Sequence, residues 1–402
     1  MKVLMLGWEL PPHNSGGLGV ACYQLCKAIS AQDVDLEFIV PYEADYTADF
    51  MTVTAARPIG LQQIDSSTIA YDSHKYVSYD GHTVTHDIYA QQLLYEQAVS
   101  RLIETKEFDI VHAHDWLTFR AALRIKERMG CPIVLHVHSV ESDRAGGNQG
   151  NPLVHEIEAT SLTLADQIIA VSDFTKQAIM RDYHIPSERI TVVHNSIDRT
   201  SFESLSDDTA YHYLAQLKGQ GYKVVTNIGR LTVQKGLPHL LRAAQEVLKR
   251  APKTMFLIVG SGEQYHELLE LAAELGISRN VLFTGFQRGK NWRDAFAIAD
   301  LFVMPSVSEP FGLTPLEAAG YGTPSIISKQ SGVSEVLRNC LKVDFWDEHE
   351  MANQIVAVVQ HDALRDTLLA NAQAEFATLS WDKAAQQLTE LYRHHTLAGA
   401  AA

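Results

Sequence analysis

The stretch SEPFGLTPLEAAGYGTP at residues 308–324 decides the fold, because it joins a strand to a helix through a short loop. It follows LFVMPS at residues 301–306, an apolar run that is short, rich in branched side chains and bounded by turn residues, as buried parallel strands are. Thr314, Pro315 and Glu317 then predict a helix start: a hydroxyl at the N-cap, proline at the first helical position, and an acid that closes a capping box. This succession is typical of an open α/β sheet that binds ligands outside the carboxyl ends of its strands, and the free N–H groups of a helix start favour an anion.

Similar strand signals recur along both halves of the chain, with helical patterns between them. In the first half they lie at residues 3–7, 36–40, 110–114, 133–138, 167–171 and 190–194. In the second half they lie at residues 224–231, 255–259, 281–284, 301–304 and 325–327. Strands that alternate with helices predict doubly wound parallel sheets covered on both faces. Residues 45–85, rich in Tyr, Asp, Ser and Thr, indicate further strands and loops.

A chain of 402 residues is long enough for two domains of about 200 residues each. The periodic pattern is lost over residues 201–221, which predicts a linker. We therefore expect an N-terminal domain over residues 1–200 and a C-terminal domain over residues 222–379. A last helix is expected at about residues 380–395, after Ser380.

The net charge of −15 argues against nucleic acid or an anionic membrane surface as the main partner. One predicted helix, at residues 118–129, carries four basic residues, which we interpret as a solvated helix face. They are Arg120, Arg124, Lys126 and Arg128. No segment approaches the run of about 18 apolar residues that a membrane-spanning helix needs.

The protein is expected in the cytoplasm. Its first residues, MKVLMLGW, form a strand pattern whose apolar run is too short for a signal peptide. The cysteines form neither a C-x-x-C pair nor a dense disulfide framework, which indicates a reducing compartment. They are Cys22, Cys26, Cys131 and Cys340.

A glycine-rich loop, PPHNSGGLG at residues 11–19, lies between the first strand and the first helix. Gly16 and Gly17 would let the backbone approach a ligand at the helix start, so the loop is a candidate phosphate or sugar site. The glycines have the wrong spacing for a dinucleotide fingerprint.

Two pairs of histidines stand at strand ends, in VHAHDW at residues 111–116 and LHVHS at residues 135–139. Residues two apart in a strand share a face, so the histidines of each pair project together. With Asp115 nearby, the pairs would suit a zinc site. The alternative, which we expect for His112 and His136, is a buried and hydrogen-bonded structural role.

Two cations, Arg230 and Lys235, lie five residues apart across a loop that follows a strand and opens a helix. An arginine that binds bidentately and a lysine that acts as a point charge can clamp a diphosphate. The alternative is a pair of solvated surface cations.

Five motifs follow in order along the chain: GGLG, HDW, H-x-H-S, GR-x4-KG and E-x7-E. Together they closely resemble those of retaining glycosyltransferases of the GT-B fold, family 4, and among these the glycogen and starch synthases. The resemblance implies an α/β fold of two Rossmann-like domains that face a cleft, with the last helix packing back on the first domain. It also implies a hexosyltransferase that moves glucose from a UDP- or ADP-sugar to an acceptor hydroxyl, with an α-glucan as one such acceptor.

The nucleotide sugar would be a co-substrate, and no metal or other cofactor is implied. Several alternatives remain open. Those synthases commonly carry a lysine where this chain has Asn14, so a sugar phosphate, a lipid or a small molecule is an alternative acceptor. A GT-B epimerase, a metal-dependent hydrolase built on the histidine pairs and a sugar-binding regulator are alternatives of other classes.

The resemblance also implies roles for single residues. Asp115 and His138 would hold hydroxyls of the donor sugar, Glu309 would reach that sugar, and Arg230 and Lys235 would stabilise the departing diphosphate. The remaining expected donor-binding positions touch the diphosphate, the ribose or the base. They are Gly16, Gly17, Gly260, Phe286, Gln287, Phe311, Gly312, Leu313, Thr314 and Glu317.

Overall fold

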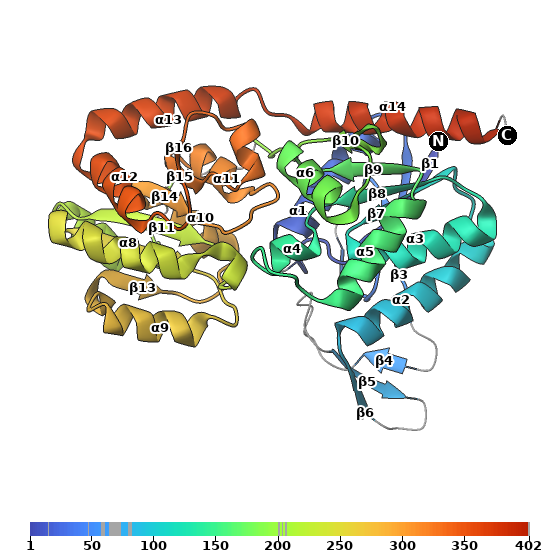
Figure 1. The fold of residues 1–402 in the computed structure, drawn as a ribbon, viewed down its shortest axis with the longest axis horizontal. Coiled ribbons are helices and arrows are strands. Elements are labelled where there is room, and N and C mark those ends of the chain that lie inside the picture. The colour runs from blue at the N-terminus through green and yellow to red at the C-terminus, as the bar shows by residue number, and fades with distance from the viewer. Residues whose placement is uncertain are drawn as a thin grey trace. The chain divides into compact units, whose positions relative to one another are not determined.

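The computed structural model describes residues 1–14, 16–46, 48–57, 61–63, 74–78, 83–199, 202, 204–205 and 207–400. They form two compact units (Figure 1). Unit 1 comprises residues 1–141, 150–196 and 380–402, and unit 2 comprises residues 142–149 and 197–379. Each unit is built around one parallel sheet, with helices on the sheet faces, so the predicted pair of Rossmann-like domains is confirmed.

Unit 1 contains a seven-stranded sheet in the order β10-β9-β8-β7-β1-β2-β3, in which every pairing is parallel. Its strands are β1 (Lys2–Leu6), β2 (Asp35–Val40), β3 (Thr52–Ala55), β7 (Ile110–His114), β8 (Ile133–Val137), β9 (Gln167–Ala170) and β10 (Ile190–Val192). Its helices are α1 (Gly17–Ser30), α2 (Ile88–Leu102), α3 (Trp116–Met129), α5 (Pro152–Leu164), α6 (Asp173–Tyr183) and α14 (Trp381–Ala400). The short helix α4 (Glu141–Arg144) lies where the chain passes from unit 1 to unit 2.

Strands were expected between residues 45 and 85, and four of them lie there. Besides β3, these are β4 (Leu61–Gln63), β5 (His74–Ser78) and β6 (Thr83–His86), which form a separate antiparallel sheet. Within the expected region, residues 45–46, 48–51 and 56–57 lie outside strands, and residues 47, 58–60, 64–73 and 79–82 lie outside the described residues.

Unit 2 contains a six-stranded parallel sheet in the order β13-β12-β11-β14-β15-β16. Its strands are β11 (Lys223–Ile228), β12 (Thr254–Val259), β13 (Val281–Phe283), β14 (Leu301–Met304), β15 (Ser325–Ser328) and β16 (Leu341–Val343). Its helices are α7 (His212–Gly219), α8 (Leu237–Arg250), α9 (Tyr265–Glu274), α10 (Gly289–Ala297), α11 (Thr314–Gly320), α12 (Glu348–Gln360) and α13 (Asp362–Phe376). Helix α7 lies within the expected linker; it buries only Leu214, which explains why it gives no periodic signal.

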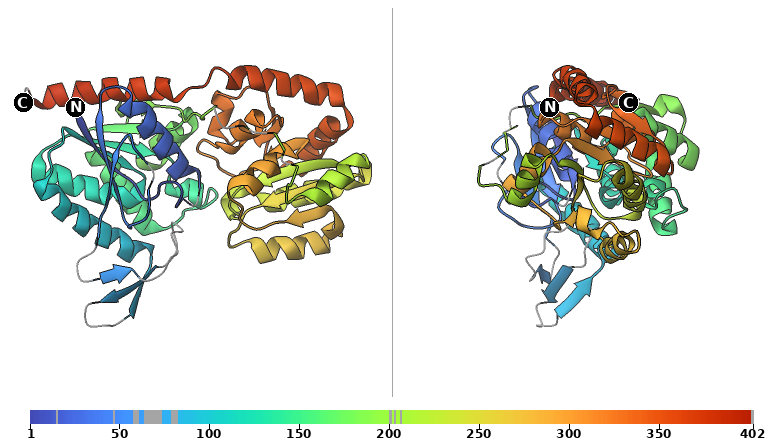
Figure 2. Two further views of the ribbon diagram at one scale, coloured as in Figure 1. Left: turned by 180° about the vertical axis from the view of Figure 1, so that it is seen from behind. Right: turned by 90° about the vertical axis from the view of Figure 1, so that its left-hand side faces the viewer.

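The central strands form the core of each unit, because a parallel sheet covered on both faces hides both sets of side chains. All residues of β7, β8, β12 and β14 are buried. Helix α8 packs its apolar face on the sheet of unit 2, with Leu240, Leu241 and Val247 at 0% exposure. Helix α14 belongs to unit 1 and packs against α1 (Figure 2).

The predicted capping box at the start of α11 is wrong. The helix begins one residue earlier than expected, so Leu313 is the N-cap residue and Thr314 is the first helical residue. The backbone of Gly312 has φ of +92°, a left-handed turn open to glycine, which places Leu313 at the helix entry. The Thr314 hydroxyl instead lies 3.7 Å from the sulfur of Met304, and no side chain caps the helix.

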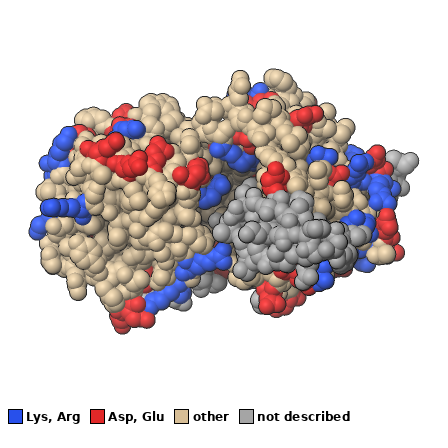
Figure 3. Space-filling view, turned by 90° about the horizontal axis from the view of Figure 1, so that it is seen from below, with Lys and Arg blue, Asp and Glu red and all other residues tan. Residues whose placement is uncertain are grey.

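The basic residues of α3 all form ion pairs. Arg120 and Arg124 both bind Glu96, at 3.0 and 3.1 Å. Lys126 binds Asp166 and Arg128 binds Glu104, at 2.7 and 2.6 Å. On the face of the molecule seen in Figure 3, acidic and basic side chains are likewise interspersed. Across the part of the chain that the structure describes, no helix is both long and apolar enough to span a membrane.

Candidate functional site

The predicted cations and Glu309 come together at the carboxyl end of the unit 2 sheet. Strands β11 and β14 are neighbours and parallel, so the loops that follow them share one edge. The short 3-10 helix η3 (Val233–Lys235), after β11, carries Lys235, whose Nζ lies 2.5 Å from Oε2 of Glu309. Ser306 donates its hydroxyl to the same oxygen at 3.0 Å, and Glu309 is buried. A buried carboxylate that is paired and hydrogen-bonded in this way is held in a single position.

Arg230 joins this group through Gln234. Its Nη2 lies 3.4 Å from Oε1 of Gln234, whose amide nitrogen donates to the carbonyl oxygen of Ser308 at 3.1 Å. The amide N–H of Val307 donates in turn to the carbonyl of Gln234 at 2.8 Å. The buried side chain of Gln234 therefore fastens the loop of the two cations to the loop of Glu309. The expected neighbourhood of Arg230, Lys235 and Glu309 is present.

Gly260 lies where three strand ends converge. A Cβ there would stand 1.8 Å from the carbonyl oxygen of Gly229, at a φ of +149°. Its amide donates to the carbonyl of Gly285 at 3.0 Å, so the ends of β11, β12 and β13 pack backbone against backbone. Close packing accounts for this glycine, whether or not a ligand also lies against it.

The residues expected to read the base follow β13. The ring of Phe286 is 49% exposed, and the guanidinium of Arg288 lies 5.1 Å from its centroid. Gln287 donates its side-chain amide to the carbonyl of Thr284 at 2.8 Å. An exposed aromatic ring at a strand end can contact a planar ligand.

Around α11 the expected contacts divide into buried and accessible groups. Phe311 is buried, so its side chain belongs to the core. Its backbone carbonyl accepts the amide of Val333 at 2.7 Å. Gly312, Leu313 and Thr314 are partly exposed. Glu317 lies in the first turn of α11, and desolvation raises its pKa to about 8. The carboxyl is therefore protonated at neutral pH and can donate as well as accept a hydrogen bond.

In unit 1, the two histidine pairs interlock across β7 and β8. The strands are parallel neighbours with His114 opposite His136. Nε2 of His112 lies 3.1 Å from Nδ1 of His136, and Nδ1 of His114 lies 3.0 Å from Nε2 of His138. His112 also hydrogen-bonds the buried hydroxyl of Tyr392 in α14. The expectation of buried, hydrogen-bonded roles for His112 and His136 is confirmed.

All four imidazoles of this histidine quartet are neutral at physiological pH. Burial lowers the pKa of both His112 and His138 to about 3. Burial also holds the pKa of His114 and His136 well below the usual value, and the neighbouring histidines add to the effect. Neutral rings can each donate at one nitrogen and accept at the other, which the chain of contacts requires.

Asp115 fixes the backbone beside His138. Its carboxylate oxygen Oδ1 accepts the amide of His138 at 2.7 Å and that of Ser139 at 3.3 Å. Asp115 is 4% exposed and has φ of +60°, a conformation that a residue with a side chain rarely adopts. A strained residue held by buried hydrogen bonds at a strand end is a frequent mark of a functional site.

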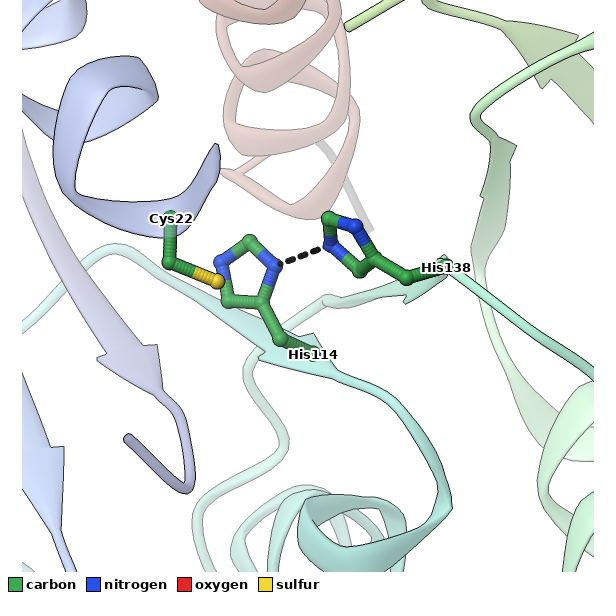
Figure 4. A group of neighbouring side chains, drawn as sticks. All are labelled: Cys22, His114 and His138. Carbon is green, nitrogen blue, oxygen red and sulfur yellow. Dashed lines mark hydrogen bonds between the residues drawn. The ribbon is translucent and has the colours of Figure 1, made fainter. Parts of the chain in front are cut away.

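Two groups in unit 1 bring metal-type ligand atoms within 4.8 Å of one another. In the first, the rings of His112 and His114 are stacked 4.5 Å apart at 21°. A nitrogen lone pair lies in its ring plane, so stacked rings cannot both point at one ion about 2 Å away. In the second, shown in Figure 4, His114 and His138 hydrogen-bond each other and burial raises the pKa of the Cys22 thiol, which disfavours the ligating thiolate. The quartet is arranged as a hydrogen-bonded core rather than a converged ligand set.

The glycine loop meets α1 at Gly17, with Gly16 as the N-cap residue in an extended conformation. The amide of Asn14 donates to the carbonyl of Gly16 at 2.9 Å. Sequence reasoning missed Glu9, which is 2% exposed and accepts the amide of Gly19 at 3.2 Å. The available signal was a single acid, Glu9, in the otherwise apolar stretch GWEL that follows β1.

Two family models match the chain. One, glycosyltransferase family 4, covers residues 15–201, and the other, glycosyl transferases group 1, covers residues 215–374. An uncharacterised glycosyltransferase of Methanocaldococcus jannaschii is 27% identical over 98% of both chains. The D-inositol 3-phosphate glycosyltransferase of Rhodococcus opacus is 30% identical over 72% of this chain and 68% of its own. A glycogen synthase of Mycobacterium tuberculosis is 28% identical over 84% of this chain and 80% of its own.

Solved structures agree at the level of the fold. Sucrose-phosphate synthase from Thermosynechococcus elongatus has a TM-score of 0.77 at 19% identity, over 99% of both chains. An Anabaena protein in complex with UDP-glucose has a TM-score of 0.73 at 20% identity, over 98% of this chain and 100% of its own. The two parallel-sheet units and their ordered motifs define a glycosyltransferase of the GT-B fold. Within that class, the chain belongs to the family 4 glycosyltransferases, and it resembles the glycogen and starch synthases.

Proposed function

We propose that this enzyme is a retaining hexosyltransferase that moves glucose from a nucleoside diphosphate sugar, with UDP or ADP as the leaving group, to a hydroxyl of an α-glucan. The observation that carries the proposal is the contact of 2.5 Å between Lys235 and Glu309, with Arg230 fastened beside it through Gln234. The donor of the solved Anabaena neighbour, UDP-glucose, supports the same class of donor.

The charge that develops in the reaction explains why these residues are grouped. As the glycosidic bond breaks, negative charge grows on the departing diphosphate. Arg230 and Lys235 can stabilise it, together with the amides of residues 312–314 at the start of α11. In this proposal Arg230 and Lys235 supply the positive charge at the leaving group, and no metal ion or further cofactor takes part. The acceptor hydroxyl attacks the anomeric carbon on the same face from which the leaving group departs, so configuration is retained. Its proton passes to the oxygen of the departing diphosphate as the old glycosidic bond breaks.

The acids have supporting roles in this proposal. Glu309, held by Lys235 and Ser306, accepts hydrogen bonds from hydroxyls of the donor sugar. Glu317, whose carboxyl keeps its proton at neutral pH, binds the ribose hydroxyls. In unit 1, His138 and Asp115 are assigned to hydroxyls of the transferred sugar. Because Nε2 of His138 contacts His114, the neutral imidazole would meet an uncharged sugar hydroxyl through Nδ1.

The cysteines fit a reducing compartment, and we assign the enzyme to the cytoplasm. All four are free thiols, three of them buried. Burial raises the pKa of Cys26 well above its usual range and that of Cys131 to about 11, which keeps these thiols protonated and unreactive.

A panel of donors tests the function. Purified enzyme is incubated with UDP-, ADP- and GDP-glucose, and release of the nucleoside diphosphate is measured with and without maltooligosaccharides. We expect release from one donor that rises with the glucan, and an α-linked product by NMR. Absence of any release, or a β-linked product, would contradict the proposal. Metal analysis of the same preparation separates it from a metal-dependent hydrolase.

A second acceptor class, a sugar phosphate, is favoured by two observations. Asn14 stands in the glycine loop, where a lysine would accompany a glucan synthase, and the relative at 30% identity is named for an inositol phosphate acceptor. Adding inositol 3-phosphate to the panel in place of the glucan decides between the two acceptors.

A further inference from the structure

A short segment, residues 142–149, belongs to unit 2, although the residues on both sides of it in the chain belong to unit 1. It begins four residues after His138 and forms a compact turn of its own. The amide of Gly147 donates to the carbonyl of Ser142 at 2.8 Å, and that of Gly146 to the carbonyl of Asp143 at 3.1 Å. Gly146 and Gly147 have φ of +63° and +84°, so the turn depends on glycine.

The segment packs on the two loops that hold the predicted donor site. A Cβ at Gly146 would stand 3.0 Å from Cγ1 of Val233, two residues before Lys235. The hydroxyl of Ser308 donates to Oδ1 of Asp143 at 2.5 Å. Asp143 and Ser308 are 3% and 8% exposed, so this charge-assisted hydrogen bond is shielded from water.

Ser308 is hydrogen-bonded in unit 2 through both its side chain and its backbone carbonyl. Its hydroxyl is bound by Asp143, its carbonyl accepts from Gln234, and the next residue along the chain is Glu309. The amide of Glu309 donates to the carbonyl of Gln330 at 2.9 Å, which fixes the backbone on its other side. Ser308 is thus held through both its side chain and its carbonyl, and a change at Asp143 would release one of these two holds.

We propose that Asp143 is a positioning residue for Glu309 that acts through the hydroxyl of Ser308. This inference rests on the proposed function, because it assigns Glu309 to the donor sugar. The bond of Asp143 to Ser308 fixes the backbone from which Glu309 projects. Its loss therefore lowers the rate of transfer more than the affinity for the nucleoside diphosphate.

The test compares Asp143→Ala, Ser308→Ala, the double variant and Ser308→Thr in the full-length enzyme. We expect kcat to fall about tenfold or more in each alanine variant, the fold-change that one hydrogen bond to a charged group is worth. The double variant should be no slower than the slower single variant, because both remove the same bond. Ser308→Thr keeps a hydroxyl and should retain most of the activity. The dissociation constant for UDP or ADP, measured by calorimetry, should stay unchanged.

A matched control is Asp382→Ala, which removes a serine–aspartate hydrogen bond of 2.7 Å, from Ser380, in unit 1. It should leave kcat unchanged. Wild-type kcat in Asp143→Ala, additive effects in the double variant, or an equal loss in nucleotide affinity would overturn the inference. If the wild-type enzyme transfers no hexose, the proposed function fails, and a crystal structure of Asp143→Ala decides the inference alone. A displaced Glu309 supports it, and an unchanged contact with Lys235 refutes it.

Discussion

Both parallel sheets have polar side chains at their carboxyl ends, but these side chains are neutral in unit 1 and charged in unit 2. At the carboxyl end of the unit 1 sheet, four histidines are packed as neutral rings that hydrogen-bond one another. At the carboxyl end of the unit 2 sheet, Lys235 and Glu309 remain an ion pair in a buried setting. A buried charge is tolerated when a partner of opposite sign and further hydrogen bonds compensate for its lost hydration, whereas an imidazole can simply release its proton. The unit 1 edge is suited to hydroxyl groups, and the unit 2 edge to an anion.

The largest expected effect on activity comes from removing the charge of Lys235 at the carboxyl end of the unit 2 sheet. Lys235→Ala should lower kcat by about 100-fold or more, since one donor to a developing negative charge is typically worth about 3 kcal/mol. The measurement is initial-rate kinetics with the donor identified by the panel, with circular dichroism to verify folding. Lys249→Ala is the matched control, because Lys249 pairs only with Glu246 on the exposed face of α8 among the described ion pairs. Retention of full activity in Lys235→Ala would refute the diphosphate clamp.

An intermediate effect on stability is expected when the pH is lowered, because the four histidines at the carboxyl end of the unit 1 sheet then become protonated. The folded-state pKa of these histidines is depressed, so the stability they contribute is complete above the unfolded value of about 6.5 and is lost as pH falls below it. Each histidine should add about 1.4 kcal/mol per pH unit to the slope of the unfolding free energy in that range. Urea unfolding at pH 7, 6 and 5 measures the slope.

The histidine prediction has its own control. His136→Asn should show a shallower slope than the wild type, while His266→Asn, which changes an exposed histidine in α9, should keep the wild-type slope. Equal slopes in all three proteins would show that the quartet is not the source of the acid sensitivity.

The smallest effect concerns Glu317, which is only partly exposed and has no cation to pair with among the described ion pairs. The folded-state pKa of Glu317 is raised, so stability depends on pH in the opposite direction from the histidines. The contribution of Glu317 to the unfolding free energy is complete below its unfolded pKa of about 4.3. It is lost as pH rises toward the folded-state pKa of about 8. Between pH 7.5 and 8.5 the four histidines of the quartet are about 90% or more neutral in both the folded and the unfolded state. The melting temperature of the wild type should fall over that interval, and that of Glu317→Gln should fall less. A parallel decline in both proteins would exclude the buried, protonated carboxyl.

Local patterns predicted most of the fold, because parallel strands buried on both faces are continuous apolar runs. The strands at residues 110–114 and 301–304 have the predicted bounds. Strand β16 was missed, since LKV at its position is short and half exposed. The start of α11 was misplaced by one residue because the left-handed turn at Gly312 was not included in the capping argument.

The candidate site was predictable where its residues share a strand end, as Arg230, Lys235 and Glu309 do on neighbouring strands β11 and β14. The hydrogen bond between Asp143 and Ser308 was not, because 165 residues separate its partners and nothing in either local sequence signals the other. The interlocking of His112 with Tyr392 was hidden for the same reason. The patterns identified which residue types lie at each sheet edge, and tertiary contacts determined how those residues are held.

The place of Tyr392 has a consequence for how the polypeptide is made. This residue is fully buried beside His112, yet it lies in α14, a helix of unit 1 that follows residues 197–379 in the chain. During synthesis, all of those residues leave the ribosome before it does. The core of unit 1 around His112 is therefore completed only after unit 2 has been synthesised. Until then His112 lacks its contact with Tyr392, which is encoded 280 codons downstream.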